Sequence, residues 1–120
     1  MKLLNRSAFA VIPKQPFVDW ANSLELDDEG LNETLTLEEH QREGTVYLID
    51  EVENDSDFDA ALSLNWSTIF ENELAAWDEM ADAWPEPRSQ ALFADWFEVK
   101  PQVMALDLAV EPVMVASLEE

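Results

Sequence analysis

Closely spaced carboxylates are the residues of this chain whose types and spacing could do chemistry. The segment Asp55–Asp59 (DSDFD) matches the first, third and fifth positions of a calcium loop, and hard cations bind clustered carboxylate oxygens. Two defining positions then fail, because Ala60 stands where the loop needs Gly and Trp66 where it needs a bidentate Glu. The pattern instead favours aspartates that begin a helix, where negative charge stabilises the N-terminus. We therefore predict no tight metal site.

His40 is the only histidine, and it lies between Glu39 and Glu43 in a segment predicted to be helical. A metal site would need ligands from elsewhere, and general acid–base catalysis would need a positioned pocket. A surface histidine is the preferred interpretation, so we predict no catalytic residue and no cofactor. A concave pocket that enclosed His40 with converging carboxylates would favour an enzyme instead, whereas a convex acidic face would favour a binding protein.

The charge of the chain is strongly unbalanced. Twenty-seven Asp and Glu oppose six Lys and Arg, which gives a net charge of -21, yet five Trp and six Phe argue for a packed core rather than disorder. Residues 1–14 hold three cations and no acid, whereas residues 25–59 hold fourteen acids and one cation. Such a field attracts basic partners and repels nucleic acids and anionic membranes.

Several classes of protein are disfavoured by the same composition. There is no Cys, so disulfide and thiol chemistry are excluded. The start of the chain does not resemble a signal peptide, and no apolar run is long enough to span a membrane. We expect a cytoplasmic protein with no membrane partner. The Trp residues fall on predicted apolar stripes, so we expect them in the core rather than in a base-stacking platform.

Periodicity and turn residues predict a single α+β domain over residues 1–120, with two layers and about three short strands that have helices packed on one face. The strands are expected at 7–12, 45–49 and 102–110, and the helices at 16–24, 36–44, 56–84 and 89–97. Acidic turns or loops are expected at 25–32 and 50–59, and residues 117–120 are expected to fray. The long helix carries its apolar stripe from Phe58 to Trp84, and we predict that Trp66 and Trp77 are buried.

The remaining acids form a candidate surface for a partner. Carboxylates two apart on a strand, or four apart on a helix, are separated by roughly 6–7 Å, which is close to the phosphate spacing of one DNA strand. An acidic protein could thereby mimic DNA and bind a DNA-binding protein. Solubility or adaptation to salt explains the same composition without any partner. The predicted partner-binding residues are Glu51, Glu53, Asp55, Asp57, Asp59, Glu71, Asp78, Glu79 and Asp82.

Five segments resemble a family of small, acidic, uncharacterised bacterial proteins. They are VIPKQPFVDW (11–20), TVYLI (45–49), IFENEL (69–74), WPEPR (84–88) and FADWF (93–97). The resemblance implies a bacterial, cytoplasmic origin and brings no activity, cofactor or catalytic residue. In general character the chain is also similar to DNA-mimic proteins of bacteria and phages. The sequence thus favours a non-enzymatic interaction protein that presents an acidic face to a basic partner; an enzyme with a carboxylate or His40 site is the alternative.

Overall fold

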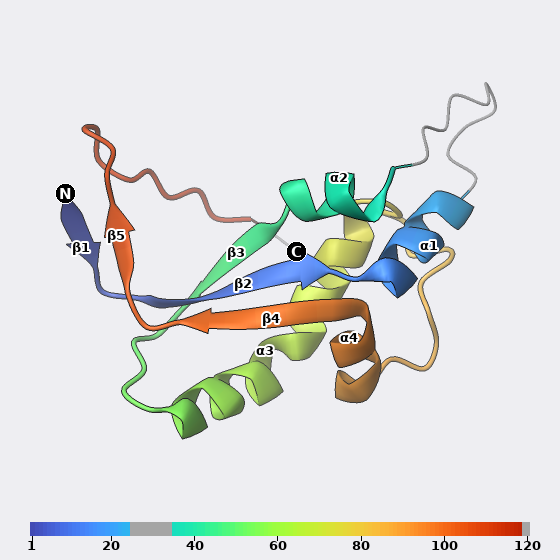
Figure 1. Ribbon diagram of the computed structural model, residues 1–120, viewed down its shortest axis with the longest axis horizontal. Coiled ribbons are helices and arrows are strands. Elements are labelled where there is room, and N and C mark those ends of the chain that lie inside the picture. The colour runs from blue at the N-terminus through green and yellow to red at the C-terminus, as the bar shows by residue number, and fades with distance from the viewer. Residues whose placement is uncertain (25–34, 119–120) are drawn as a thin grey trace.

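Strand β2 (Ser7–Pro13) is the centre of a three-stranded antiparallel sheet. It pairs on one side with β3 (Thr45–Ile49) and on the other with β4 (Phe97–Gln102), so that Val11 lies between Thr45 and Val99. We describe residues 1–24 and 35–118 of a computed structural model, shown in Figure 1. The acidic turn expected at 25–32 and the last two residues of the expected frayed end therefore lie outside the described residues.

A second, two-stranded sheet projects beyond the end of the first one (Figure 1). It pairs β1 (Lys2–Leu4) with β5 (Ala105–Asp107) in antiparallel register, and we call this pair the arm. Buried Ser7 fixes its base, because the Ser7 hydroxyl donates to the Val103 carbonyl at 2.8 Å and accepts from the Val52 amide at 3.0 Å. The prediction of an α+β domain is confirmed, but five strands in two sheets replace the expected three.

Two short helices follow the predicted signals. Helix α1 (Gln15–Ser23) has Pro in its first turn and buries Phe17. Helix α2 (Leu37–Arg42) begins with the predicted capping box, in which the Thr36 hydroxyl accepts from the Glu39 amide while the Glu39 carboxylate accepts from the Thr36 amide. These hydrogen bonds satisfy backbone donors at the start of α2 that would otherwise have no partner.

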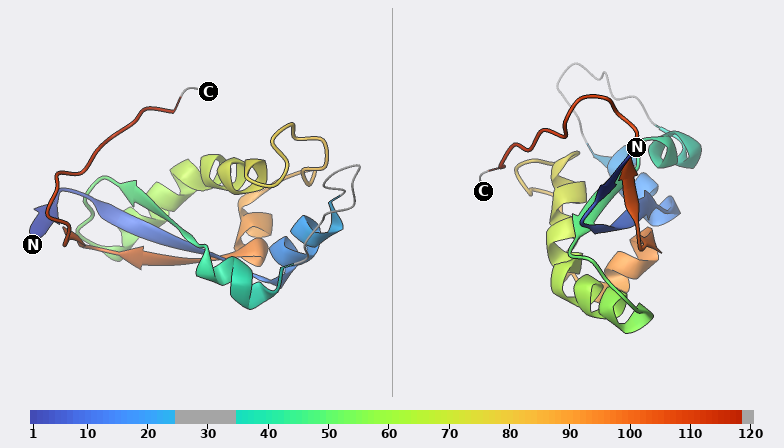
Figure 2. Two further views of the ribbon diagram at one scale, coloured as in Figure 1. Left: turned by 90° about the horizontal axis from the view of Figure 1, so that it is seen from above. Right: turned by 90° about the vertical axis from the view of Figure 1, so that its left-hand side faces the viewer.

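Helix α3 (Asp55–Ala75) covers one face of the three-stranded sheet (Figure 2). Its Phe58 and Phe70 rings pack on Phe9 of β2 and Phe97 of β4, with centroids 5.9 and 5.8 Å apart. The helix begins within one residue of the expected start near Ser56, but its expected end at Trp84 is wrong. Asn54 caps it by accepting from the Asp57 amide, so it begins at Asp55, and it stops well before Trp84.

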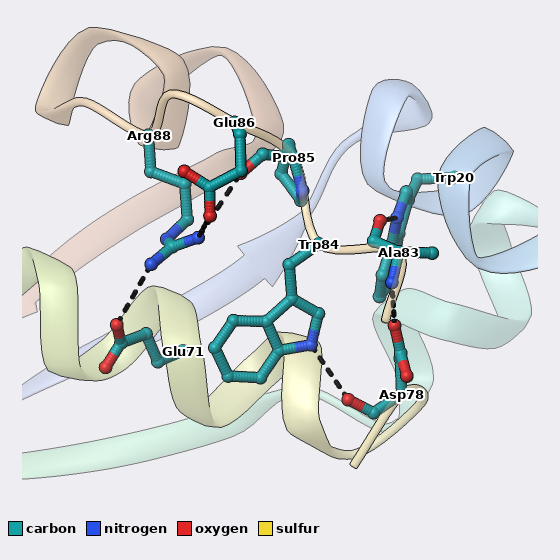
Figure 3. A network of polar contacts seen from close by, with 8 residues as sticks. All are labelled: Trp20, Glu71, Asp78, Ala83, Trp84, Pro85, Glu86 and Arg88. Atoms are coloured by element: carbon teal, nitrogen blue, oxygen red, sulfur yellow. Dashed lines mark hydrogen bonds and ion pairs between the residues drawn. The ribbon is translucent and has the colours of Figure 1, made fainter. Parts of the chain in front are cut away.

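The early end of α3 has a visible cause in the loop that follows (Figure 3). The Asp78 carboxylate accepts from the backbone amides of Asp82 and Ala83 at 3.3 and 2.6 Å, and its carbonyl accepts from the Trp84 indole at 2.8 Å. The indole of Trp20 donates to the Ala83 carbonyl at 2.9 Å, which ties the loop to α1. These bonds offer the backbone an alternative to helical pairing.

Helix α4 (Gln90–Trp96) begins at the predicted cap, where the Ser89 hydroxyl accepts from the Leu92 amide. The single strand expected at 102–110 is replaced by two, because β4 starts immediately after α4, at Phe97, and only the short β5 lies wholly inside the expected range. Pairing with β2 puts Phe97 in the core, where its ring packs 4.9 Å from that of Phe17. The chain then turns into β5, and residues 108–118 form no helix or strand.

The large rings at the centre of the core are phenylalanines and not tryptophans, and buried aliphatic residues such as Val11 and Leu74 complete it. Phe9, Phe70, Phe93 and Phe97 are almost completely buried, whereas all five Trp are only partly buried. The prediction that Trp66 and Trp77 are buried is therefore wrong, since both pack against the edge of the core with part of their rings in solvent.

Candidate acidic site and the pocket beside it

The first group of predicted partner-binding acids lies at the N-terminal end of α3. Glu51 and Glu53 are exposed in the loop after β3, and Asp55, Asp57 and Asp59 are exposed in the first turns of the helix. The expected extended spacing does not apply to these three aspartates, because positions two apart on a helix point to different sides. They stabilise the helix start instead, as the alternative interpretation of the calcium-like motif predicted.

The second group lies at the other end of α3 and beyond it. Glu71 pairs with Arg88 at 3.2 Å, and Asp78 holds the loop of Figure 3, so these two carboxylates have structural partners. Glu79 and Asp82 are exposed and have no ion pair among the described residues. Of the four, Glu79 and Asp82 are thus the better placed to meet a partner.

A neutral stretch of helix separates the two groups. Residues 60–70 of α3 contain no charged side chain, and their exposed positions are Ala60, Ser63, Leu64, Ser67 and Thr68. Because α3 has 21 residues, its ends lie about 30 Å apart at 1.5 Å per residue. The predicted acids therefore form two patches at the two ends of one helix and not one continuous ladder.

Most of the few cations already have partners within the chain. Lys2 pairs with Asp107 at 3.5 Å, Arg42 with Glu38 at 3.2 Å, and Arg88 with both Glu71 and Glu86. Lys14 donates to the Ala94 carbonyl at 2.8 Å. The chain thus has little positive charge left with which to balance its other carboxylates.

A concave pocket lies beside the second acidic group, between α2, β3 and the end of α3. Its volume is about 530 Å³. Carboxylates and aromatic rings line it, and no Lys or Arg does. The lining residues are Pro13, Phe17, His40, Glu43, Thr45, Asn72, Glu73, Ala75, Ala76, Trp77 and Glu79.

His40 forms part of an aromatic wall of this pocket and is not the surface residue that the sequence favoured. Its side chain is buried, with its ring centroid 4.9 Å from that of Trp77 and 5.8 Å from that of Phe17. Burial lowers the pKa of His40, against the opposing effect of Glu43 and Glu39. The imidazole Nε2 is buried without a hydrogen-bond partner among the described residues. At neutral pH the wall that His40 forms is therefore uncharged.

Two residues of the pocket lining, Asn72 and Glu73, form a polar cluster with Tyr47 of β3, which does not itself line the pocket. The Tyr47 hydroxyl donates to Glu73 Oε2 at 2.5 Å and accepts from Asn72 Nδ2 at 2.8 Å. Burial raises the pKa of the Glu73 carboxyl, while hydrogen bonds from Tyr47 and Thr45 lower it in part. Burial, and next the hydrogen bond to Glu73, raise the pKa of Tyr47. The phenol is therefore a firm proton donor to this carboxylate.

The pocket suits a cationic group better than an anionic or metallic one. Its carboxylates accept hydrogen bonds from an ammonium or guanidinium, and its aromatic rings attract cations over their faces. Among the described residues, no three His, Asp or Glu side chains are grouped so that they could hold a metal ion. The pocket is also the concave site around His40 that, on the sequence, would favour an enzyme.

Sequence reasoning missed Tyr47, Asn72 and Glu73. The sequence predicts Tyr47 in a strand, and it predicts Asn72 and Glu73 on the outer face of a long helix. Tyr47 and Glu73 are 26 positions apart, so no local pattern connects them. Only the packing of β3 beside α3 brings them together. The one available signal was a tyrosine in a short apolar strand, since a buried hydroxyl usually needs a hydrogen-bond partner.

Neither a membrane-spanning helix nor a known relative helps to assign a function to the described residues. Within residues 1–24 and 35–118, no helix has the length and apolar character needed to cross a membrane. Comparison of the chain with protein-family models, with curated proteins and with solved structures gives no match. Any functional conclusion must therefore come from the geometry and charge of the chain itself.

Proposed function

We propose that this protein binds a basic partner protein and that a lysine or arginine side chain of the partner enters the pocket beside α3. The observation that carries the proposal is the lining of the pocket, in which Glu43, Glu73 and Glu79 meet the rings of Phe17 and Trp77 without any cation. An ammonium group in the pocket can donate hydrogen bonds to the carboxylates and contact the aromatic rings.

The charge of the whole chain supports the same proposal. A net charge of -21 attracts basic proteins over distances longer than any single contact, which raises the rate of association. Mimicry of DNA is a narrower form of the proposal and makes the partner a DNA-binding protein. In that form the partner contacts both acidic groups, about 30 Å apart along α3, and passes over the neutral stretch between them.

A defined probe tests the proposal. A fluorescent hexalysine peptide is titrated with the protein at low salt, and binding is measured by the anisotropy of the peptide. The double variant Glu43→Gln/Glu79→Gln should weaken binding by about tenfold, equivalent to about 1.4 kcal/mol. Binding should also weaken steeply as salt is added, because the attraction is screened.

The control removes the same charge elsewhere. Asp95 and Glu98 are exposed and lie in neither acidic group nor the pocket, so Asp95→Asn/Glu98→Gln should change binding by no more than about twofold. An equal loss in both double variants would show that net charge alone attracts the peptide. No binding of the peptide by the unchanged protein at low salt would contradict the proposal itself.

A second candidate is an enzyme that acts on a small amine, and the presence of the pocket around His40 is what favours it. Glu73 would be the acid–base group, since its pKa is raised by burial and Tyr47 fixes its orientation. Glu73→Gln separates the two candidates. A binding protein loses affinity for hexalysine in this variant, because Glu73 is one of the three carboxylates that line the pocket, whereas an enzyme loses turnover while its substrate still binds.

A further inference from the structure

The two outer edges of the three-stranded sheet differ in how they are protected. Exposed edges pair with other chains unless charges or prolines interrupt them. Strand β4 carries such residues, Glu98, Lys100 and Pro101. Strand β3 (TVYLI) has neither a charge nor a proline, and Val46 and Leu48 are 62% and 53% exposed. The β3 edge is thus suited to accept another strand.

A groove runs between this edge and α3. Two adjoining hollows form it, of about 90 and 550 Å³, and both are lined by Leu48, Ile49 and Asn65. The α3 side of the groove comes mostly from the neutral stretch that separates the acidic groups, with Asp57 at one end, and Asp50 and Glu51 also line the larger hollow. The neutral stretch includes Leu64, which is 81% exposed although it is a large apolar residue. An extended segment laid here would pair with β3 and cover Leu64.

The chain carries a segment of matching character at its other end. Residues 108–118 (LAVEPVMVASL) hold one charge and no regular structure, and Figures 1 and 2 show them running apart from the sheet and helices. Their large apolar residues are exposed, Val110 by 96%, Met114 by 90% and Val115 by 86%. We call residues 108–118 the tail.

Contacts with the arm hold the first residues of the tail in place and set the direction in which the tail extends. Lys2 of β1 forms an ion pair with Asp107 at 3.5 Å and donates to the Glu111 carbonyl at 3.3 Å, and the Ala109 amide donates to Asp107 at 2.9 Å. These contacts attach the base of the tail to the arm, and Pro112 follows directly. Beyond this point the tail does not touch its own β3, whose Val46 and Leu48 stay exposed.

We infer that the protein forms a symmetric dimer in which the tail of each copy adds as a strand to the β3 edge of the other, in the groove beside α3. Each chain supplies both a tail and a β3 edge. In a two-fold symmetric dimer, each tail therefore pairs with the β3 edge of the other copy, and no tail or β3 edge is left without a partner. Main-chain pairing with β3 gives affinity, and the groove beside Leu64 receives alternate side chains of the tail. The tail and the groove residues together approach the roughly 20–30 residues a side of a specific interface.

Charge limits where a second copy can approach. With a net charge of -21, two copies repel each other over most of their surface. The β3 edge, residues 60–70 of α3 and the tail are the least charged parts, since together they hold only Glu111, although Asp50, Glu51 and Asp57 line part of the larger hollow. Association through these parts is driven by apolar burial and opposed by the surrounding carboxylates. Added salt should therefore strengthen the dimer, in contrast to the binding of a basic partner.

Analytical ultracentrifugation of the full chain tests this inference. The protein should sediment at about twice its chain mass of 13.7 kDa, and the dissociation constant should fall as salt is raised. The groove variant Leu64→Asp and the tail variant Val113→Asp/Val115→Asp should each raise this constant about tenfold or more. The control Met80→Asp/Gln90→Asp adds the same charge as the tail variant at exposed positions outside the tail and the groove, and it should have little effect.

Mixing the two variants identifies the exchange itself. In a mixed dimer, the intact tail of the groove variant meets the intact groove of the tail variant, so one native contact is restored. The mixture should therefore associate more tightly than either variant alone, with circular dichroism showing that both are folded. A protein that stays monomeric at about 0.1 mM would overturn the inference. A mixture that associates no better than its components would also overturn it.

Discussion

Replacing Tyr47 with Phe removes one hydroxyl and isolates the interaction that shapes the pocket wall. The hydroxyl donates to the Glu73 carboxylate at 2.5 Å, and both side chains are partly buried. A hydrogen bond to a charged acceptor stabilises a fold by about 1.5–3 kcal/mol, and a neutral one by about 0.5–1.5 kcal/mol. Because water reaches part of both side chains, we expect a cost of about 1.5–2 kcal/mol when Glu73 is ionised.

The cost should depend on pH in a defined direction. Burial raises the pKa of Glu73 in the folded state, so its contribution to stability is present in full below the unfolded pKa and is lost as pH rises through the folded pKa. The Tyr47 hydrogen bond opposes this loss by stabilising the carboxylate. Without it the pKa of Glu73 rises further, and the difference between Tyr47→Phe and the unchanged protein should grow from pH 5 to pH 8.

Urea unfolding followed by tryptophan fluorescence measures this difference. At pH 8 the variant should be less stable by about 1.5–2 kcal/mol, and at pH 5 by about 1 kcal/mol or less. In a Glu73→Gln background the pH dependence of the Tyr47→Phe effect should vanish. A cost that is the same at both pH values, or a pH dependence that persists in the Gln background, would refute the link between this hydroxyl and the Glu73 charge.

Two further predictions concern the fold. The melting temperature should rise from low-salt buffer to a few tenths molar sodium chloride, because few cations balance the carboxylates. At physiological ionic strength, dissolved ions shorten the range of the repulsion between carboxylates to about 8 Å. A flat or falling curve in calorimetry would mean that the acids are compensated locally. Phe70→Ala should lower the free energy of unfolding in urea by about 3–5 kcal/mol, since the ring is fully buried against Phe93, Trp96 and Phe97. Trp66→Ala should lower it clearly less, because the Trp66 ring is partly in solvent. The reverse order would contradict a core whose large rings are phenylalanines.

Features that depend on neighbouring residues were predictable from the sequence. The capping box of Thr36 and Glu39 and the cap at Ser89 are contacts over three positions, so the starts of α2 and α4 follow from local patterns. The apolar run Thr45–Ile49 likewise predicts β3 with the observed bounds. The α+β class follows from the order of such segments.

Features that depend on distant residues were not predictable. The apolar period continues past Ala75, but the side chain of Asp78 and the indole of Trp20 hold the next residues in a loop. Phe97 continues the period of α4, and only its pairing with Pro13 of β2 makes it the first residue of a strand. The same limit applies to the site, because Tyr47 and Glu73 meet through packing and not through spacing. Acid composition alone could not show that the predicted surface divides into two groups.

The position of β2 has a consequence for how the chain folds during synthesis. This strand is made first among the three of its sheet, yet its partner β4 follows more than 80 residues later. At about 5–20 residues per second, the ribosome needs roughly 5–20 s to supply that partner. Until then Phe9 and Val11 lack one side of their final surroundings, and contacts between such distant segments form slowly. The nascent chain therefore completes its sheet only after β4 has been synthesised, and the chaperones that bind exposed apolar strands have that interval in which to act.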